Sequence, residues 1–217
     1  MMTLKFLPVK GKIFPFQAGQ FIIVYFLDNR LGKTGKPYSI SSSPRDKFLT
    51  ITVKKVGVFS SALHKLKKGE QVKIIGPYGN FYPDESMKNL VFLAGGIGIA
   101  PFFSIIKDFY LKKSPEKIFL FYSNRTEKEI VFFGELNKIA GQWPGLKPIY
   151  FLTREKTREK IIGEYCRINI KILKKYLKGL KGNYYFVCGP KEFVFDLCQK
   201  LKNSGVSEKF IKTEAFY

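Results

Sequence analysis

The chain before residue 84 alternates short apolar runs with turns rich in glycine, proline and serine. The runs are FIIVYFL, PYSIS, FLTITVKKV and QVKIIGPYG, separated by segments such as DNRLGKTG and SSPRDK. Runs of β-branched and aromatic residues bounded by turn residues are typical of antiparallel strands. The pattern therefore predicts a small antiparallel β-barrel in this half of the chain.

A different rhythm begins after residue 88. The apolar runs LVFLA, KIFLFYS, KPIYFLT and NYYFVCG alternate with helical patterns at residues 101–111, 130–140, 170–180 and 191–203. Strands that alternate with helices at this spacing are typical of a parallel sheet in an α/β domain. We therefore predict two domains, a β-barrel at residues 1–86 and a parallel-sheet, nucleotide-binding α/β domain at residues 87–217.

The run LVFLAGGIGIAPFF at residues 90–103 predicts a strand, a tight turn and a helix. Gly95, Gly96 and Gly98 can adopt positive φ and allow a ligand to approach the backbone, and Pro101 suits a first helical position. The free amides at such a helix start can bind a phosphate. Pro101 replaces the last glycine of the usual dinucleotide fingerprint, so a purely structural turn is the alternative.

Polar and small residues recur at the expected carboxyl ends of the strands, where parallel sheets bind ligands. They include Ser123 and Asn124 after the second strand and Cys188, Gly189 and Pro190 after the fourth.

Basic residues stand where an NAD site would place an acid to hold the ribose hydroxyls. Arg125 follows the second strand of the sheet, Thr153 and Arg154 follow the third, and Arg167 comes later. Although a single arginine is more often a solvated surface charge, the group favours a 2′-phosphate. We therefore predict NADP(H), with NAD(H) as the alternative.

Several motifs, in order along the chain, resemble those of the ferredoxin–NADP reductase family of FAD-dependent oxidoreductases. KPYSISS at residues 36–42 is similar to the flavin motif R-x-Y-[ST]-x-x-[ST], and GVFS at residues 57–60 is similar to the pyrophosphate turn G-x-x-S. GPYGNF at residues 76–81, GGIGIAP at residues 95–101, CGP at residues 188–190 and the C-terminal EAFY resemble further family motifs.

This resemblance implies roles for individual residues. Tyr38 would pack on the isoalloxazine, and Ser39 would hydrogen-bond near its N5. Ser60 and the amides of Gly57, Val58 and Phe59 would hold the FAD pyrophosphate. The implied cofactor-binding set also includes Lys36, Pro37, Ile51, Val53, Gly95, Gly96, Gly98, Pro101, Gly189, Pro190 and Phe216.

The resemblance further implies a catalytic set of Ser39, Cys188, Glu214 and Tyr217. Cys188 and Glu214 would line the nicotinamide side in positional and electrostatic roles, and neither would act as a nucleophile. Tyr217 would stack on the open face of the flavin.

Two departures from the family pattern affect these expectations. Lys36 replaces the arginine of the flavin motif, so we expect weaker FAD binding, because a lysine cannot grip a phosphate bidentately. Residues 4–9 resemble the second strand of the family barrel, and the first strand is missing. We expect a partner, a second copy or further residues to cover the resulting open edge.

The formal net charge is +21, from 38 Lys plus Arg against 17 Asp plus Glu, so the surface attracts anions. An acidic electron carrier fits this charge, although lysine-rich residue usage explains it equally well. We expect no nucleic-acid partner, because no recognised binding motif is present.

Three cysteines without a CxxC pair argue against a disulfide framework and a metal site. With no membrane span or signal peptide in evidence, we expect a cytoplasmic protein.

Together these features predict an FAD-dependent enzyme that takes a hydride from NADPH and passes electrons to a separate carrier such as ferredoxin or flavodoxin. The alternatives are a reductase for free flavin, a cytochrome or an oxygenase component, and an electron-transfer subunit that needs a partner chain.

Overall fold

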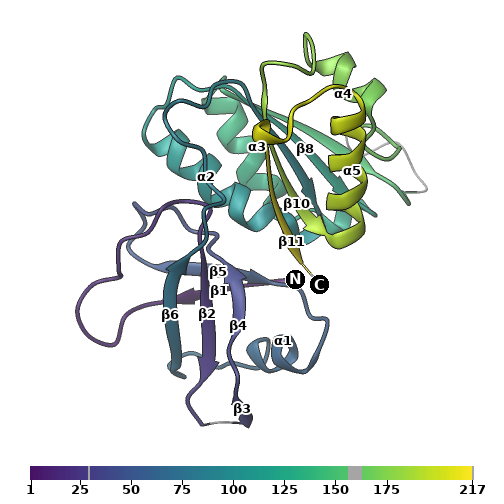
Figure 1. Cartoon of the computed structure of the whole chain (residues 1–217). Helices are drawn as coiled ribbons and strands as arrows, with labels where there is room; N and C mark the ends of the chain where they lie inside the picture. The colour runs from purple at the N-terminus through teal and green to yellow at the C-terminus, as the bar shows by residue number, and fades with distance from the viewer. Residues whose placement is uncertain (29, 156–162, 217) are drawn as a thin grey trace.

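The computed structural model describes residues 1–28, 30–155 and 163–216. Its N-terminal half contains two antiparallel sheets (Figure 1). One pairs β1 (Met2–Phe6) with β5 (Leu49–Val53), and the other has the order β4 (Lys36–Ser39), β2 (Phe21–Phe26), β6 (Val72–Tyr78). An isolated bridge between Ile40 and Ile51 connects the two sheets. Short elements β3 (Arg30–Lys33) and α1 (Val58–Leu63) complete this half.

The apolar core of the barrel follows from the alternation in its strands. Side chains along β2 alternate between buried and half-buried, so one face of the strand points into the core. Ile22, Val24, Ile40 and Ile51 are each fully buried there. The predicted antiparallel β-domain is confirmed.

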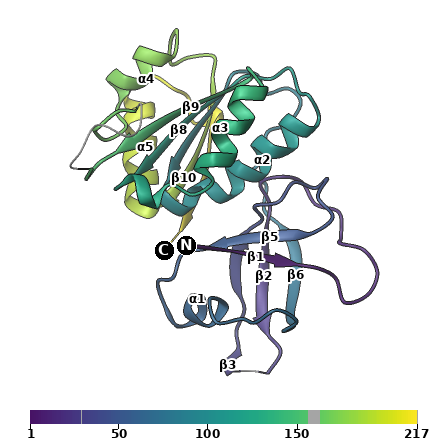
Figure 2. The ribbon, with the colours of Figure 1, turned by 180° about the vertical axis from the view of Figure 1, so that it is seen from behind.

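The C-terminal half is a five-stranded parallel sheet with the order β11 (Ile211–Phe216), β10 (Tyr184–Pro190), β7 (Leu90–Gly95), β8 (Ile118–Asn124), β9 (Leu146–Leu152). Helices α2 (Ile99–Leu111) and α3 (Phe133–Gln142) cover one face, and α4 (Ile170–Tyr176) and α5 (Lys191–Asn203) cover the other, as Figure 2 shows from behind. All six residues of β7 are buried, as expected for a central strand covered on both faces. The predicted α/β architecture is confirmed.

Several expected boundaries were wrong. Helix α2 begins at Ile99 because a 3-10 turn, η1 (Gly96–Gly98), precedes it, so Pro101 is the third helical residue and not the first. Helix α3 begins at Phe133, after η2 (Glu127–Glu129) and a left-handed Phe132 with φ 60°. Helix α4 ends at Tyr176, because Leu177 is extended. Strand β1 spans Met2–Phe6 and not residues 4–9.

Strand β11 was not predicted, although it completes the edge of the sheet beside β10. It follows the short turn η3 (Glu208–Phe210) and points down toward the barrel (Figure 1). Among the described residues, no helix is long and apolar enough to cross a membrane.

Candidate cofactor-binding site

The flavin motif of the barrel meets the last strand of the α/β domain. Ser39 ends β4 and is 5% exposed, and its Oγ donates a hydrogen bond to Glu214 Oε2 at 3.3 Å. In the register of the sheet, Glu214 lies beside Cys188, which lies beside Ala94 at the end of β7. The carboxyl end of the sheet therefore faces the flavin motif, as expected for a ligand site in a parallel sheet.

Burial controls the ionisation of both candidate catalytic groups from the α/β domain. It raises the pKa of Glu214 to about 7, and the hydrogen bond from Ser39 partly opposes this shift. Burial also raises the pKa of Cys188 well above its ordinary value, and the nearby charge of Glu214 adds to the effect. A raised pKa favours the neutral thiol at Cys188.

Tyr38 and the turn at residues 57–60 lie together, although they are separate in sequence. The Tyr38 ring stacks with Phe59 at 6.2 Å between centroids and an interplanar angle of 29°. Burial raises the pKa of Tyr38 to about 12, so its hydroxyl stays protonated. Lys36 and Pro37, just before it, are exposed.

Ile51 and Val53 sit differently from the other predicted flavin contacts. Their side chains are 0% and 1% exposed and belong to the barrel core, so only their main chain is left to meet a ligand.

The Ser60 hydroxyl is used within its own turn. Its Oγ accepts hydrogen bonds from the Val56 and Gly57 amides, both at 2.9 Å, and donates to the Gly57 carbonyl at 3.0 Å. This arrangement shapes the turn at the start of α1. Any phosphate contact here is therefore left to the main-chain amides of Val58 and Phe59.

The glycines at residues 95–98, in the loop predicted to bind the nicotinamide dinucleotide (the nicotinamide loop below), serve two different purposes. Gly96 has φ 53°, and a Cβ built there meets no atom within 4 Å, so the backbone is open to a ligand. At Gly98 a Cβ would lie 2.2 Å from the Cys188 carbonyl oxygen, so this glycine allows close packing of η1 on β10. Gly95 and Gly189 pack under the Phe193 ring of α5. The loop thus fits close approach of a dinucleotide at Gly96.

Two of the predicted basic residues are adjacent. The Arg154 amide donates to the Arg125 carbonyl at 2.8 Å, and the Thr153 amide donates to the Asn124 carbonyl at 3.0 Å. Both arginine side chains are exposed. Arg167 is also exposed, on the segment that follows the bridge between Glu164 and Phe151 at the edge of the sheet.

Sequence reasoning missed an acidic residue at the same place. Glu155 directly follows Arg154, and its Oε2 accepts a hydrogen bond from the Glu127 amide at 2.9 Å. The negative charge of this carboxylate would repel the 2′-phosphate of NADPH. Its position directly after Thr153 and Arg154 is the signal that could have revealed it.

Comparison with known proteins identifies both halves of the chain. Residues 2–82 match the oxidoreductase FAD-binding domain, and residues 92–199 match the oxidoreductase NAD-binding domain. The chain belongs to the ferredoxin–NADP reductase-like family.

Relatives within this reductase-like family include the sulfhydrogenase 2 subunit gamma of Pyrococcus furiosus, 29% identical over 95% of this chain and 74% of that protein. The ferredoxin reductase component of the 3-ketosteroid-9-alpha-monooxygenase of Mycolicibacterium smegmatis is 30% identical over 93% of this chain and 56% of that protein. The chain spans about half the length of several curated relatives that it matches.

Solved structures share the reductase-like fold. The flavohem-like FAD/NAD-binding domain of nitric oxide dioxygenase from Vibrio cholerae has a TM-score of 0.86 and 22% identity, and covers 99% of this chain and 91% of its own. A ferredoxin–NADP+ reductase from Neisseria gonorrhoeae, solved with FAD and NADP, has a TM-score of 0.81 and 22% identity, and covers 99% and 92%.

The end of the reductase-like chain is described up to Phe216. This residue pairs with Pro190 in the register of the sheet and packs against the core beneath α2 and α3. Tyr217 lies outside the described residues, so its predicted stacking on the flavin stays a prediction.

Proposed function

We propose that this chain oxidises NADPH with bound FAD and passes the electrons to a separate one-electron carrier. The observation that carries the proposal is the hydrogen bond from Ser39 to Glu214, because it joins the flavin motif to the nicotinamide end of the sheet. When bound, FAD accepts a hydride from NADPH and releases the two electrons singly.

The remaining roles belong to the side chains. Tyr38 supplies an uncharged aromatic face beside Phe59 for the flavin ring. Glu214 holds a proton up to about pH 7, so with Ser39 it offers a proton-bearing pair at the junction of the two domains. Buried Cys188 shapes the wall between Glu214 and Ala94.

NADPH is our first choice of nicotinamide because Arg125 and Arg154 place two guanidinium groups on adjacent loops. The carboxylate of Glu155 favours NADH as the second choice, since a carboxylate accepts hydrogen bonds from a free ribose 2′-hydroxyl.

An acidic carrier is the proposed electron acceptor. Next to the proposed flavin site, Val56 and Val58 are each 74% exposed, and Lys54 and Lys55 beside them are exposed as well. Apolar side chains framed by lysines suit an acidic protein surface.

We also propose that a partner or second copy covers the outer edge of β1, which pairs with β5 alone among the described strands. The domain limits at residues 1–86 and 87–217 and a cytoplasmic location remain our proposals.

The alternative is a reductase component for an oxygenase, for a cytochrome or for free flavin, or a subunit that is active only with a partner chain. Oxygenase reductase components and a sulfhydrogenase gamma subunit among the relatives favour this alternative.

The decisive assay loads the purified protein with FAD and measures NADPH oxidation with a ferredoxin, a flavodoxin, a cytochrome or free flavin. We expect rapid turnover with an acidic carrier. Turnover with free flavin alone supports the alternative, and no oxidation of NADPH or NADH contradicts the proposal.

A further inference from the structure

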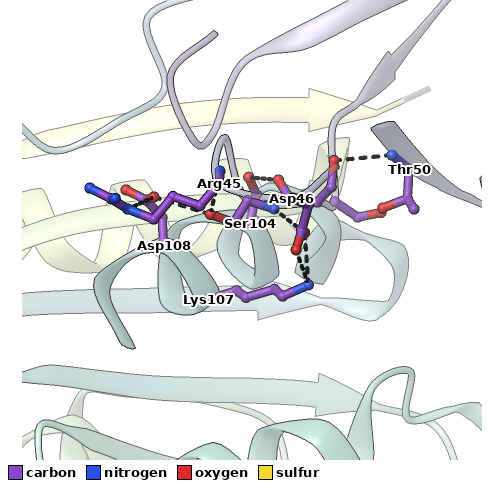
Figure 3. Close-up of polar contacts among 9 residues, drawn as sticks. Arg45, Asp46, Thr50, Ser104, Lys107 and Asp108 are labelled. Atoms are coloured by element: carbon purple, nitrogen blue, oxygen red, sulfur yellow. Dashed lines mark hydrogen bonds and ion pairs between the residues drawn. The ribbon is translucent and has the colours of Figure 1, made fainter. Parts of the chain in front are cut away.

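A set of polar contacts joins the segment after the flavin motif to helix α2, which carries the nicotinamide loop (Figure 3). Ser104 Oγ donates to the Ser42 carbonyl at 2.5 Å, and Ser43 Oγ donates to Asp108 Oδ1 at 3.1 Å. We call these residues, with the pairs that follow, the clamp.

Ion pairs complete the clamp. Lys107 Nζ donates to both carboxylate oxygens of Asp46, at 2.8 and 2.7 Å, and Arg45 Nε lies 3.5 Å from Asp108 Oδ1 (Figure 3). Asp108 is 3% exposed, so its carboxylate is enclosed by the groups that it contacts. Removing one partner of a buried charge is costly, which gives the clamp a defined geometry.

Elsewhere the two domains meet through the Ser39–Glu214 hydrogen bond already described, a hydrogen bond from Lys212 Nζ to the Tyr82 carbonyl at 2.9 Å, and apolar packing. Phe81, at the end of the barrel sequence, packs against Phe102 of α2 at 5.4 Å and against Phe186 of β10 at 5.4 Å between ring centroids. Aromatic contacts of this kind prefer edge-to-face or tilted geometry, but over a broad range of angles. They hold the domains together, whereas hydrogen bonds constrain the angle between them more sharply.

The interface beside the clamp is not filled. A cavity of about 580 Å³ opens there, lined by Ser41, Asp46 and Phe48 from the barrel and by Phe103, Lys107 and Phe132 from α2 and the segment before α3. Because this side of the interface is open, the clamp supplies directional contacts that restrain the angle between the domains here, while the Ser39–Glu214 hydrogen bond restrains it at the site.

The clamp lies close to both halves of the proposed site. Ser42 and Ser43 follow Ser39 by three and four residues, with Ile40 and Ser41 fixed by backbone hydrogen bonds to Gln20 and Thr50. In α2, residues 104–108 lie about 8 to 14 Å along a rigid helix from Ile99, at the end of the nicotinamide loop. A tilt at the clamp thus moves the nicotinamide loop relative to the flavin motif.

We propose that Lys107 and Asp108 are positioning residues that set the distance between nicotinamide and flavin. The inference rests on the proposed function. Hydride transfer oxidises NADPH to NADP+ and reduces the bound flavin by two electrons, and its rate is sensitive to displacement of the reacting atoms by about 1 Å. Loss of the clamp therefore slows this step without weakening the binding of either cofactor.

The test uses FAD-loaded Asp108→Asn and Lys107→Met proteins. We expect the rate constant for flavin reduction at saturating NADPH to fall about 10- to 100-fold. The dissociation constants of FAD and NADP+ stay within about twofold of the parent, and 4-deuterated NADPH shows a full primary isotope effect. Lys107→Arg keeps the charge and recovers the rate to within about threefold.

Lys112→Met is the matched control. Lys112 pairs with the other oxygen of Asp108 at 2.5 Å, but from the same helix, so it does not cross between the domains. Its loss costs stability but leaves the contacts between the domains in place, so we expect its reduction rate within about twofold of the parent. An equal loss in Lys112→Met and Lys107→Met, or an unchanged rate in both Lys107→Met and Asp108→Asn, overturns the proposal.

Hydrogen exchange of the FAD-free protein gives a second reading that needs no turnover. Amides at residues 41–46 exchange faster in the clamp variants if the clamp holds this segment, and unchanged exchange contradicts the inference. If Asp108→Asn does not fold, Lys107→Met and Asp46→Asn carry both measurements. A parent protein that neither NADPH nor NADH reduces refutes the proposed function, while the exchange result still decides whether the clamp exists.

Discussion

Replacing Glu214 by glutamine tests the electrostatics of the site. Burial raises the pKa of this carboxyl from 4.5 to about 7 in the folded protein. In the unfolded chain the pKa returns to its ordinary value, so the folded state binds more protons between these two values. The contribution to stability is complete below the unfolded pKa and is lost as the pH rises through the folded pKa.

The size of the effect follows from this difference. One unit of pKa corresponds to about 1.4 kcal/mol, so the full shift is worth about 3 kcal/mol, of which about 2.5 kcal/mol falls between pH 5 and pH 8. Glutamine cannot ionise. We therefore expect the free energy of unfolding of the parent, relative to Glu214→Gln, to fall by about 2.5 kcal/mol over this range.

Urea unfolding of the FAD-free protein at pH 5 and pH 8 measures the difference. Trp143, the only tryptophan, is 8% exposed and lies in the same half of the chain as Glu214, so its fluorescence reports on the relevant domain. Glu208→Gln is the control, because the Glu208 side chain is 80% exposed and its replacement leaves the pH profile of the parent unchanged. Parallel profiles for the parent and Glu214→Gln would show that folding does not raise the pKa of this carboxyl.

Three further predictions concern the ligands. Lys36→Arg tightens FAD by about 1 kcal/mol, because arginine grips a phosphate bidentately, and fluorescence titration checks this; an unchanged or weaker dissociation constant places Lys36 away from the phosphate. Arg154→Ala costs about 1 to 3 kcal/mol in kcat/KM for NADPH and little for NADH, and equal losses in steady-state kinetics contradict the assignment. The association rate with an acidic carrier falls steeply as the salt concentration rises above physiological ionic strength, where the Debye length is about 8 Å. A salt-insensitive rate would show that the lysines do not steer the carrier.

Much of the fold could be predicted because its strands carry strong local signals. β10 and α5 stand out in sequence, since a buried apolar run ends in Gly189 and Pro190 and an amphipathic helix follows. β11 lacks this signal. Its sequence IKTEAF lies at a sheet edge and its residues are half-buried or exposed, so few apolar positions mark it.

Local geometry could be predicted where a motif fixes the backbone, and not where distant segments meet. The open backbone at Gly96 follows from its glycine-rich loop. The contact between Ser39 and Glu214 spans 175 residues, and the clamp residues Lys107 and Asp108 look like ordinary polar positions of a helix. Which face of α2 meets the barrel depends on tertiary packing, which the local sequence pattern does not reveal.

The proposed reaction is tested by anaerobic titration of the FAD-loaded protein with NADPH. We expect the purified protein to take up FAD, to show the visible absorbance of an oxidised flavin, and to lose that absorbance on addition of one equivalent of NADPH. A protein that binds no flavin, or a bound flavin that neither NADPH nor NADH bleaches, is incompatible with the proposed function.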